Sequence, residues 1–179
     1  MDGSDRERRD TAYHEAGYAV AWHLLGRVID YITLEDDWFA ESLGHTRYRI
    51  PTEEERSAAD INERYLRDRI ITAYAGGYAS QKLGAGYDEA GCTDDLQQVA
   101  EYNSALGGSK EEAAERLAQL SAEARALVET GWPAIEVLAT LLLEREDVGG
   151  ADAARLIHAA LLAPPGRNAF DAPPERAVA

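Results

Sequence analysis

The chain has 179 residues, 45% of them hydrophobic, which is enough for one domain with a substantial core. Its 33 acidic and 18 basic residues give a net charge of −15, which argues against nucleic acid and anionic membrane surfaces as partners, because both attract clustered Lys and Arg. A single cysteine excludes an internal disulfide framework. Without a signal-peptide pattern or an apolar run near about 20 residues, we expect a cytoplasmic domain that does not cross a membrane.

The first part of the chain predicts a helix followed by a β-hairpin. Residues 1–9 are charged and are expected to form a flexible N-terminus. Asp10 suits a helix N-cap, so a helix is predicted over residues 11–25. Residues 28–35 and 42–50 are typical of two paired strands. An isolated hairpin is only marginally stable, so this one must lie against helices.

The remainder is predicted to be helical. Helices are expected at about residues 60–82, 95–106, 110–132, 133–147 and 151–162. Pro133 suits the first turn of a helix, and therefore separates the third of these from the fourth. Residues 164–179 are Pro-rich and are expected to be a disordered tail. The fold class is thus mainly α with a small β-hairpin, in one domain of residues 10–163.

The first predicted helix, in the segment DTAYHEAGYAVAWHLLG, comes close to the His-Glu-x-x-His pattern of zinc proteases, but position 18 is Tyr18. Four residues turn a helix by about 400°, so His14 and Tyr18 share one face. Glu15 lies about 100° around, where a carboxylate can act as general base on a metal-bound water. A lone His-Glu pair is more often structural than catalytic. His23 falls on the opposite face from His14 and is interpreted as structural.

Five segments, in order, resemble the FtsH-type zinc metalloprotease domain family. They are TAYHEAGYAVAWHLLG, LGHTRYRIPTEEE, LRDRIITAYAGGYASQKLG, GCTDDLQQVAEY and EVLATLLLEREDVGGADAARLI. The resemblance covers roughly residues 10–162 and implies a zincin-type helical domain with zinc as cofactor. It also implies that peptides or unfolded polypeptides are the substrate.

The resemblance assigns roles to individual residues. It implies that His14 is the first zinc ligand, Glu15 the catalytic base and Asp95 the carboxylate ligand. Asp94 matches an Asn of the family, which suggests a supporting or capping role. Tyr18 stands where the family has its second histidine ligand.

Three outcomes are open for Tyr18. It can ligate the metal as a phenolate, which requires loss of a proton from a phenol of pKa about 10. Alternatively, His14 and Asp95 hold the metal more weakly, with water in the remaining positions. In the third outcome no metal binds, and Tyr18 forms a hydrogen bond with Asp95 or Glu15.

Other side chains are weaker candidates. Strand alternation places His45 on the same face as two arginines, which favours a solvated face over the site. Tyr78 stands where the family has Arg, and is a candidate for lining the site. With Tyr18, Tyr74 and Tyr87 it is expected to form either packed core or a small tyrosine-lined pocket. Cys92 and His158 are interpreted as structural.

Glycines inside the predicted helices indicate close packing. Gly17, Gly76 and Gly77 each lower helix stability by up to about 1 kcal/mol relative to Ala, which close approach of two helices can offset. That approach would bring Asp95 towards His14.

The expected function is metal-assisted peptide-bond hydrolysis, weakened or lost because of Tyr18. The chain contains no Gly-x-x-x-x-Gly-Lys-Ser/Thr loop, so ATP is not expected as a ligand. An extended peptide could add to the edge of the hairpin. The alternatives are a non-catalytic peptide- or protein-binding pseudoprotease and a small-molecule enzyme that uses the tyrosine-lined pocket. Homo-oligomerisation is left open.

Overall fold

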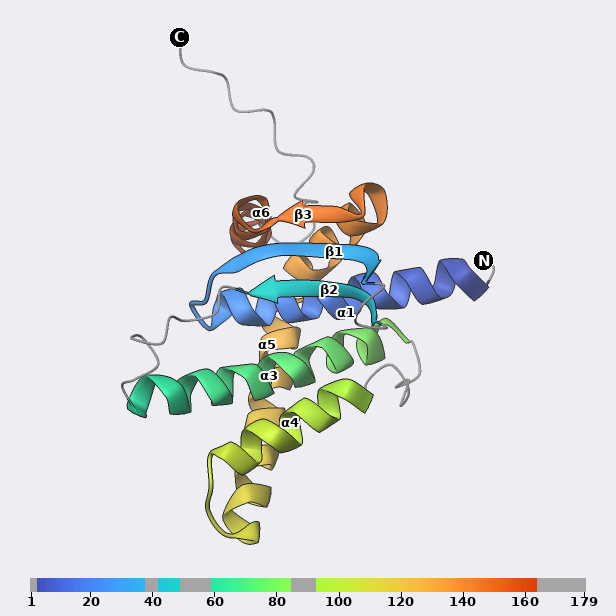
Figure 1. Ribbon diagram of the computed structural model, residues 1–179. Helices are drawn as coiled ribbons and strands as arrows, with labels where there is room; N and C mark the ends of the chain where they lie inside the picture. The colour runs from blue at the N-terminus through green and yellow to red at the C-terminus, as the bar shows by residue number, and fades with distance from the viewer. Residues whose placement is uncertain (1–2, 38–41, 49–58, 85–92, 164–179) are drawn as a thin grey trace.

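The computed structural model describes residues 3–37, 42–48, 59–84 and 93–163, and these form a mainly α domain with one small sheet (Figure 1). The elements in chain order are α1 (Gly3–Leu24), β1 (Ile29–Asp37), β2 (Ser42–Tyr48), α3 (Ala59–Leu83), α4 (Thr93–Ala105), α5 (Lys110–Arg145), β3 (Asp147–Gly149) and α6 (Gly150–Leu162). The predicted fold class is therefore confirmed. Tyr87, Cys92 and the Pro-rich tail lie outside the described residues.

Helix α1 begins at Gly3, eight residues before the predicted start. Asp10 is therefore inside the helix and does not cap it, and residues 3–9 continue the helix instead of lying outside the domain. Charged side chains explain the extension: Arg6 and Asp10 approach to 4.0 Å, and Arg8 donates a hydrogen bond of 2.9 Å to Glu146. Arg and Glu are also good helix formers, so a charged segment need not be disordered.

The sheet contains three strands in the order β2-β1-β3. The antiparallel pairing of β1 with β2 matches the predicted hairpin, and pairs Ile32 with Thr46. Strand β3 was not predicted, because three residues are too short to show alternation. It pairs Ile32 with Val148 on the other side of β1 and leaves β2 at an edge of the sheet.

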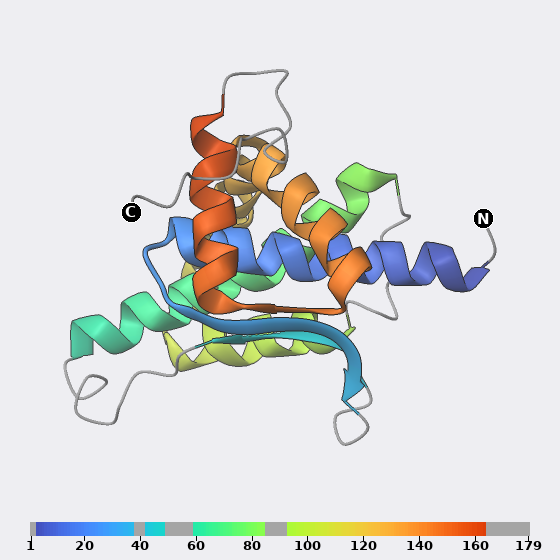
Figure 2. The ribbon, with the colours of Figure 1, turned by 90° about the horizontal axis from the view of Figure 1, so that it is seen from above.

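Helix α1 lies between the sheet and α3 and is the centre of the fold (Figure 1). Small residues allow a close approach to α3: a Cβ atom on Gly17 would lie 2.7 Å from Ala79 Cβ and 2.9 Å from the Ala75 carbonyl oxygen. The expectation of close packing from the helical glycines holds at this position. Helix α5 packs against both α1 and α3, and Figure 2 shows α6 beside the C-terminal part of α5.

The prediction of two helices on either side of Pro133 is wrong, because α5 runs unbroken from Lys110 to Arg145. Proline removes one hydrogen bond from a helix interior. Burial of Val128, Ile135 and Leu138 in the core offsets that loss and holds the two halves together. A capping box at Ser109 and Glu112 begins the helix.

By length and composition alone, α5 is the one helix in the described residues that could cross a membrane. Core helices of soluble domains pass the same test, and Leu120, Ala124, Ala139 and Leu142 of this helix are buried within the domain.

Candidate metal and catalytic site

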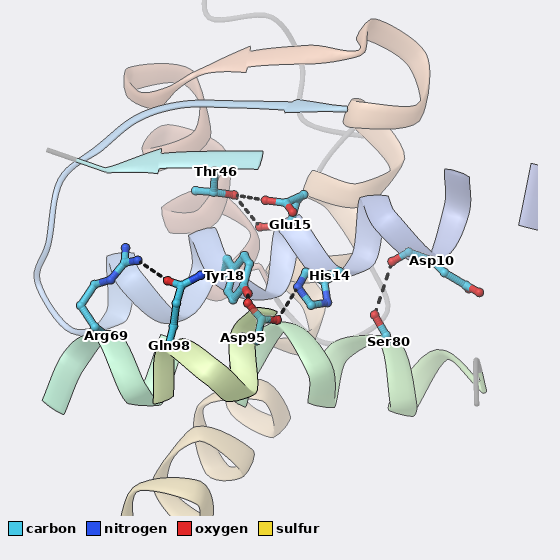
Figure 3. Close-up of polar contacts among 9 residues, drawn as sticks. All are labelled: Asp10, His14, Glu15, Tyr18, Thr46, Arg69, Ser80, Asp95 and Gln98. Carbon is cyan, nitrogen blue, oxygen red and sulfur yellow. Dashed lines mark hydrogen bonds and ion pairs between the residues drawn. The ribbon is translucent and has the colours of Figure 1, made fainter. Parts of the chain in front are cut away.

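His14 and Tyr18 lie on one face of α1 and both contact Asp95 in the first turn of α4 (Figure 3). The Tyr18 hydroxyl donates a hydrogen bond to Asp95 Oδ1. His14 Nε2 lies 3.2 Å from Asp95 Oδ2. The four-residue spacing on α1 thus places the two side chains as predicted, and the fold brings a carboxylate from 77 positions further along the chain to them.

Gly76 makes room for both rings between α1 and α3. A Cβ atom at this position would lie 2.9 Å from His14 Nε2 and 3.0 Å from Tyr18 Cε1. The two rings meet edge to face with centroids 4.6 Å apart. The glycine in α3 is therefore required by the site side chains, whereas Gly17 is required by the packing of the helices.

The two oxygens of Asp95 have different surroundings. Oδ1 accepts the hydrogen bond from Tyr18. Oδ2 is buried, faces His14, and has no well-aligned hydrogen-bond donor among the described residues. A buried carboxylate oxygen without such a donor is unusual in a folded protein and suggests a missing partner such as a cation.

Burial by itself would lower the pKa of His14, but the contact with Asp95 and the negative charges of Glu15 and Asp95 outweigh it and raise the pKa above 6.5. A metal ion that binds His14 must compete with a proton for the imidazole nitrogen.

Glu15 points away from Asp95, towards the sheet (Figure 3). Its carboxylate accepts a hydrogen bond of 2.7 Å from the Thr46 hydroxyl on β2. Only 4% of Glu15 is exposed, and this burial raises its pKa to about 7, although the charge of His14 and the hydrogen bond from Thr46 act in the other direction.

Thr46 was not among the predicted site residues. The signal was present, because Thr46 follows His45 in the strand segment that resembles the protease family, and alternation places neighbouring strand residues on opposite faces. A residue on the face opposite His45 was therefore a candidate for contact with the first helix.

His14 Nε2 and Asp95 Oδ2 fit two positions of a zinc site. Two ligands of a tetrahedral zinc ion lie about 3.4 Å apart, since each metal–ligand bond is about 2.0–2.2 Å. The observed separation is 3.2 Å. Within the described ranges, no three His, Cys, Asp or Glu side chains gather around a common point, and Tyr18 is the candidate third donor that these ranges place beside Asp95.

Of the other predicted site residues, Asp94 and Tyr78 lie away from the contact between His14 and Asp95. Asp94 is exposed on the first turn of α4. Tyr78 contacts α5, where its hydroxyl lies 2.5 Å from Ser121 Oγ and Arg125 lies 4.4 Å from its ring centroid. His45 is opposite Thr33 in the sheet, and its side chain lies outside the described part of the structure.

The predicted tyrosine cluster is only partly formed. Tyr74 and Tyr78 stack with ring centroids 6.2 Å apart, whereas Tyr18 contacts Asp95. His23 and His158 are close enough for the charge of His158 to add to the effect of burial in lowering the pKa of His23.

Comparison with known proteins agrees with this geometry. Residues 1–106, more than half of the chain, match peptidase family M41. The ATP-dependent zinc metalloprotease FtsH of Thermobaculum terrenum is 38% identical over 100 residues, which are 55% of this chain and 14% of that protein. The protein of the same name from Borreliella burgdorferi is 34% identical over 99 residues, covering 55% of this chain and 15% of that protein.

FtsH 1 of Petrotoga mobilis, also an ATP-dependent zinc metalloprotease, is 37% identical over 101 residues, covering 55% of this chain and 14% of that protein. The matched region is thus a small part of these curated relatives and contains the candidate site. The family match, over residues 1–106, includes His14, Glu15 and Asp95. The chain belongs to peptidase family M41.

Proposed function

We propose that this domain hydrolyses peptide bonds in peptides or unfolded polypeptides with the help of zinc, more weakly than family members with two histidine ligands. The observation that supports this most directly is the approach of His14 Nε2 to the buried Asp95 Oδ2, at 3.2 Å, one position along α1 from a buried glutamate. His14 and Asp95 would hold the ion. When bound, zinc supplies Lewis acidity that polarises a carbonyl group and acidifies water.

Glu15 is suited to the proton transfers of hydrolysis. It would accept a proton from the attacking water and deliver it to the departing amine. A carboxylate with a pKa of about 7 in the metal-free protein is well matched to both tasks near neutral pH. Thr46 would hold the carboxylate in one orientation through its hydroxyl.

The edge strand β2 gives an extended substrate a place to bind. Among the described residues no further strand pairs with its outer edge, and Thr46 in this strand contacts Glu15. A peptide that pairs with β2 would place its backbone close to the catalytic carboxylate. The net charge of −15 disfavours nucleic acid and anionic membrane lipid as partners.

The test combines metal analysis with cleavage of an unstructured peptide. The purified protein should cleave the peptide when loaded with zinc and lose this activity on chelation and in Glu15→Gln. Tyr18→His should bind zinc more tightly and cleave faster. Absence of cleavage in the zinc-loaded wild type and in Tyr18→His would refute the proposal.

One observation favours a second candidate, a peptide-binding domain without catalysis. The Tyr18 hydroxyl already occupies Asp95 Oδ1, so the carboxylate is partly satisfied by the protein itself. This alternative requires that a peptide bind with the same affinity to the zinc-loaded wild type, to the wild type in chelator, and to Glu15→Gln. The small-molecule alternative gains no support, because Tyr18 and Tyr78 contact different elements.

A further inference from the structure

We propose that Tyr18 is a positioning residue for metal binding: its hydroxyl holds Asp95 through Oδ1 and thereby presents Oδ2 towards His14, while the phenol itself does not ligate the metal. This inference rests on the proposed zinc site. It explains what Tyr18 contributes at the position where the family has its second histidine ligand.

The division of roles between the two Asp95 oxygens is the main evidence. Tyr18 donates to Oδ1, whereas Oδ2 is buried, lacks a well-aligned donor among the described residues, and lies 3.2 Å from His14 Nε2. A carboxylate with one oxygen hydrogen-bonded and the other facing an imidazole nitrogen is prepared for single-oxygen ligation. Ligating carboxylates are commonly held by such outer hydrogen bonds.

The position of Asp95 in the fold explains why it needs this support. Helix α4 packs mainly on α3, whereas His14 belongs to α1. Asp95 reaches α1 from the first turn of α4 through its contacts with His14 and Tyr18 (Figure 3). Tyr18 is itself held in place, because its ring meets the His14 ring edge to face and lies against Gly76.

The contact geometry favours a supporting role over ligation. The Tyr18 hydroxyl is directed at Asp95 Oδ1, whereas His14 Nε2 faces the other carboxylate oxygen, Oδ2. As a hydrogen-bond donor the hydroxyl keeps its proton and strengthens the orientation of a charged acceptor. Among the described residues, the metal would then have His14 and Asp95 as its protein ligands.

The experiment is a zinc titration of the wild type, Tyr18→Phe and Tyr78→Phe, followed by metal affinity and by the near-ultraviolet absorbance of tyrosinate. Tyr18→Phe removes only the hydroxyl and should weaken zinc binding about 10- to 100-fold. Tyr78→Phe is the matched control, since it also removes a tyrosine hydroxyl from a contact, with Ser121, but away from Asp95, and should leave the affinity unchanged. Zinc should produce no tyrosinate signal in the wild type.

Three results would overturn the inference. A tyrosinate signal that appears with zinc and vanishes in Tyr18→Phe would make Tyr18 a ligand. Tighter zinc binding by Tyr18→Phe would make Tyr18 a competitor for Asp95. Equal affinity in wild type and Tyr18→Phe would remove any role for the hydroxyl. Each of these leaves the zinc site in place, whereas failure of the wild type and Tyr18→His to bind zinc would refute the proposed function as well.

Discussion

Replacing Gly150 with alanine tests how the sheet is held against α6. A Cβ atom at this position would lie 1.8 Å from the Ile29 carbonyl oxygen and 2.8 Å from that of Asp30. Both obstacles are backbone atoms of β1, so no side-chain rotation can relieve them. Gly149 offers a matched control, because a Cβ atom there would meet nothing within 4 Å and its φ of −66° suits any residue.

The magnitude follows from the distances. Restoring an ordinary contact of 3.4 Å from 1.8 Å requires β1 and α6 to separate by about 1.6 Å, the difference between the two values. Overpacking in a core costs about 1–3 kcal/mol or more, and the better helix propensity of alanine returns up to about 1 kcal/mol. We therefore expect Gly150→Ala to lower the free energy of unfolding by about 2 kcal/mol. Gly149→Ala loses an N-cap glycine and should cost less than about 1 kcal/mol.

Chemical unfolding in urea measures both variants, and thermal unfolding should show a decrease of roughly 4–8 °C in Tm for Gly150→Ala. Because β1 pairs Ile32 with Thr46, the displacement should also loosen the contact of Thr46 with Glu15. Equal stability losses in the two variants would contradict the close approach of Gly150 to β1.

Four further outcomes are expected. In chelated protein, Glu15 has a folded-state pKa of about 7, against an ordinary value of 4.5. The folded state therefore binds the extra proton between these pH values, and stability should fall as the pH rises from about 4.5 to 7. Glu15→Gln should abolish that slope and add up to about 3 kcal/mol at pH 8 in urea unfolding, and an unchanged slope would contradict it. Thr46→Val removes the hydroxyl that donates to Glu15 and should slow peptide cleavage by the zinc-loaded protein roughly tenfold, whereas Thr46→Ser keeps a hydroxyl and should restore the rate. Equal rates in the wild type and both variants would show that Thr46 has no role in the site. Gly76→Ala should weaken zinc binding in a competitive chelator titration, because the added Cβ atom would press on the His14 and Tyr18 rings. Unchanged zinc affinity would show that the site does not need the space left by Gly76. Ser109→Ala should lower the free energy of unfolding in urea by about 1 kcal/mol, because it removes the N-cap of α5. Ser104→Ala is the comparison: this serine lies near the end of α4, and its replacement should change stability much less.

The elements with strong local patterns could be predicted from the sequence. Apolar periodicity located α3, α4 and α6 within a few residues, and alternation located β1 and β2. The prediction failed where local signals were misleading or too short. Pro133 is typical of a helix start, yet tertiary burial carries α5 through it. Strand β3 has only three residues, and its pairing with β1 defines it.

For the site, helical geometry alone places His14 and Tyr18 on one face of α1 with Glu15 about a quarter-turn away. The role of Asp95 depended on a family resemblance, because an isolated aspartate at a helix start is usually a favourable dipole contact. The sequence could not decide among three outcomes for Tyr18. The structure reduces these alternatives, because the Tyr18 hydroxyl donates a hydrogen bond to Asp95 Oδ1.

The sequence by itself determined the helical class, the hairpin and the face of α1 that carries the candidate chemistry, because these depend on residues a few positions apart. Only the tertiary structure decided that Asp95 Oδ2 faces His14, that Thr46 holds Glu15, and that Tyr78 contacts α5. Each of these contacts joins residues at least 31 positions apart. Such contacts depend on how whole helices and strands pack together. Their packing angles produce no periodic pattern of apolar residues from which they could be predicted.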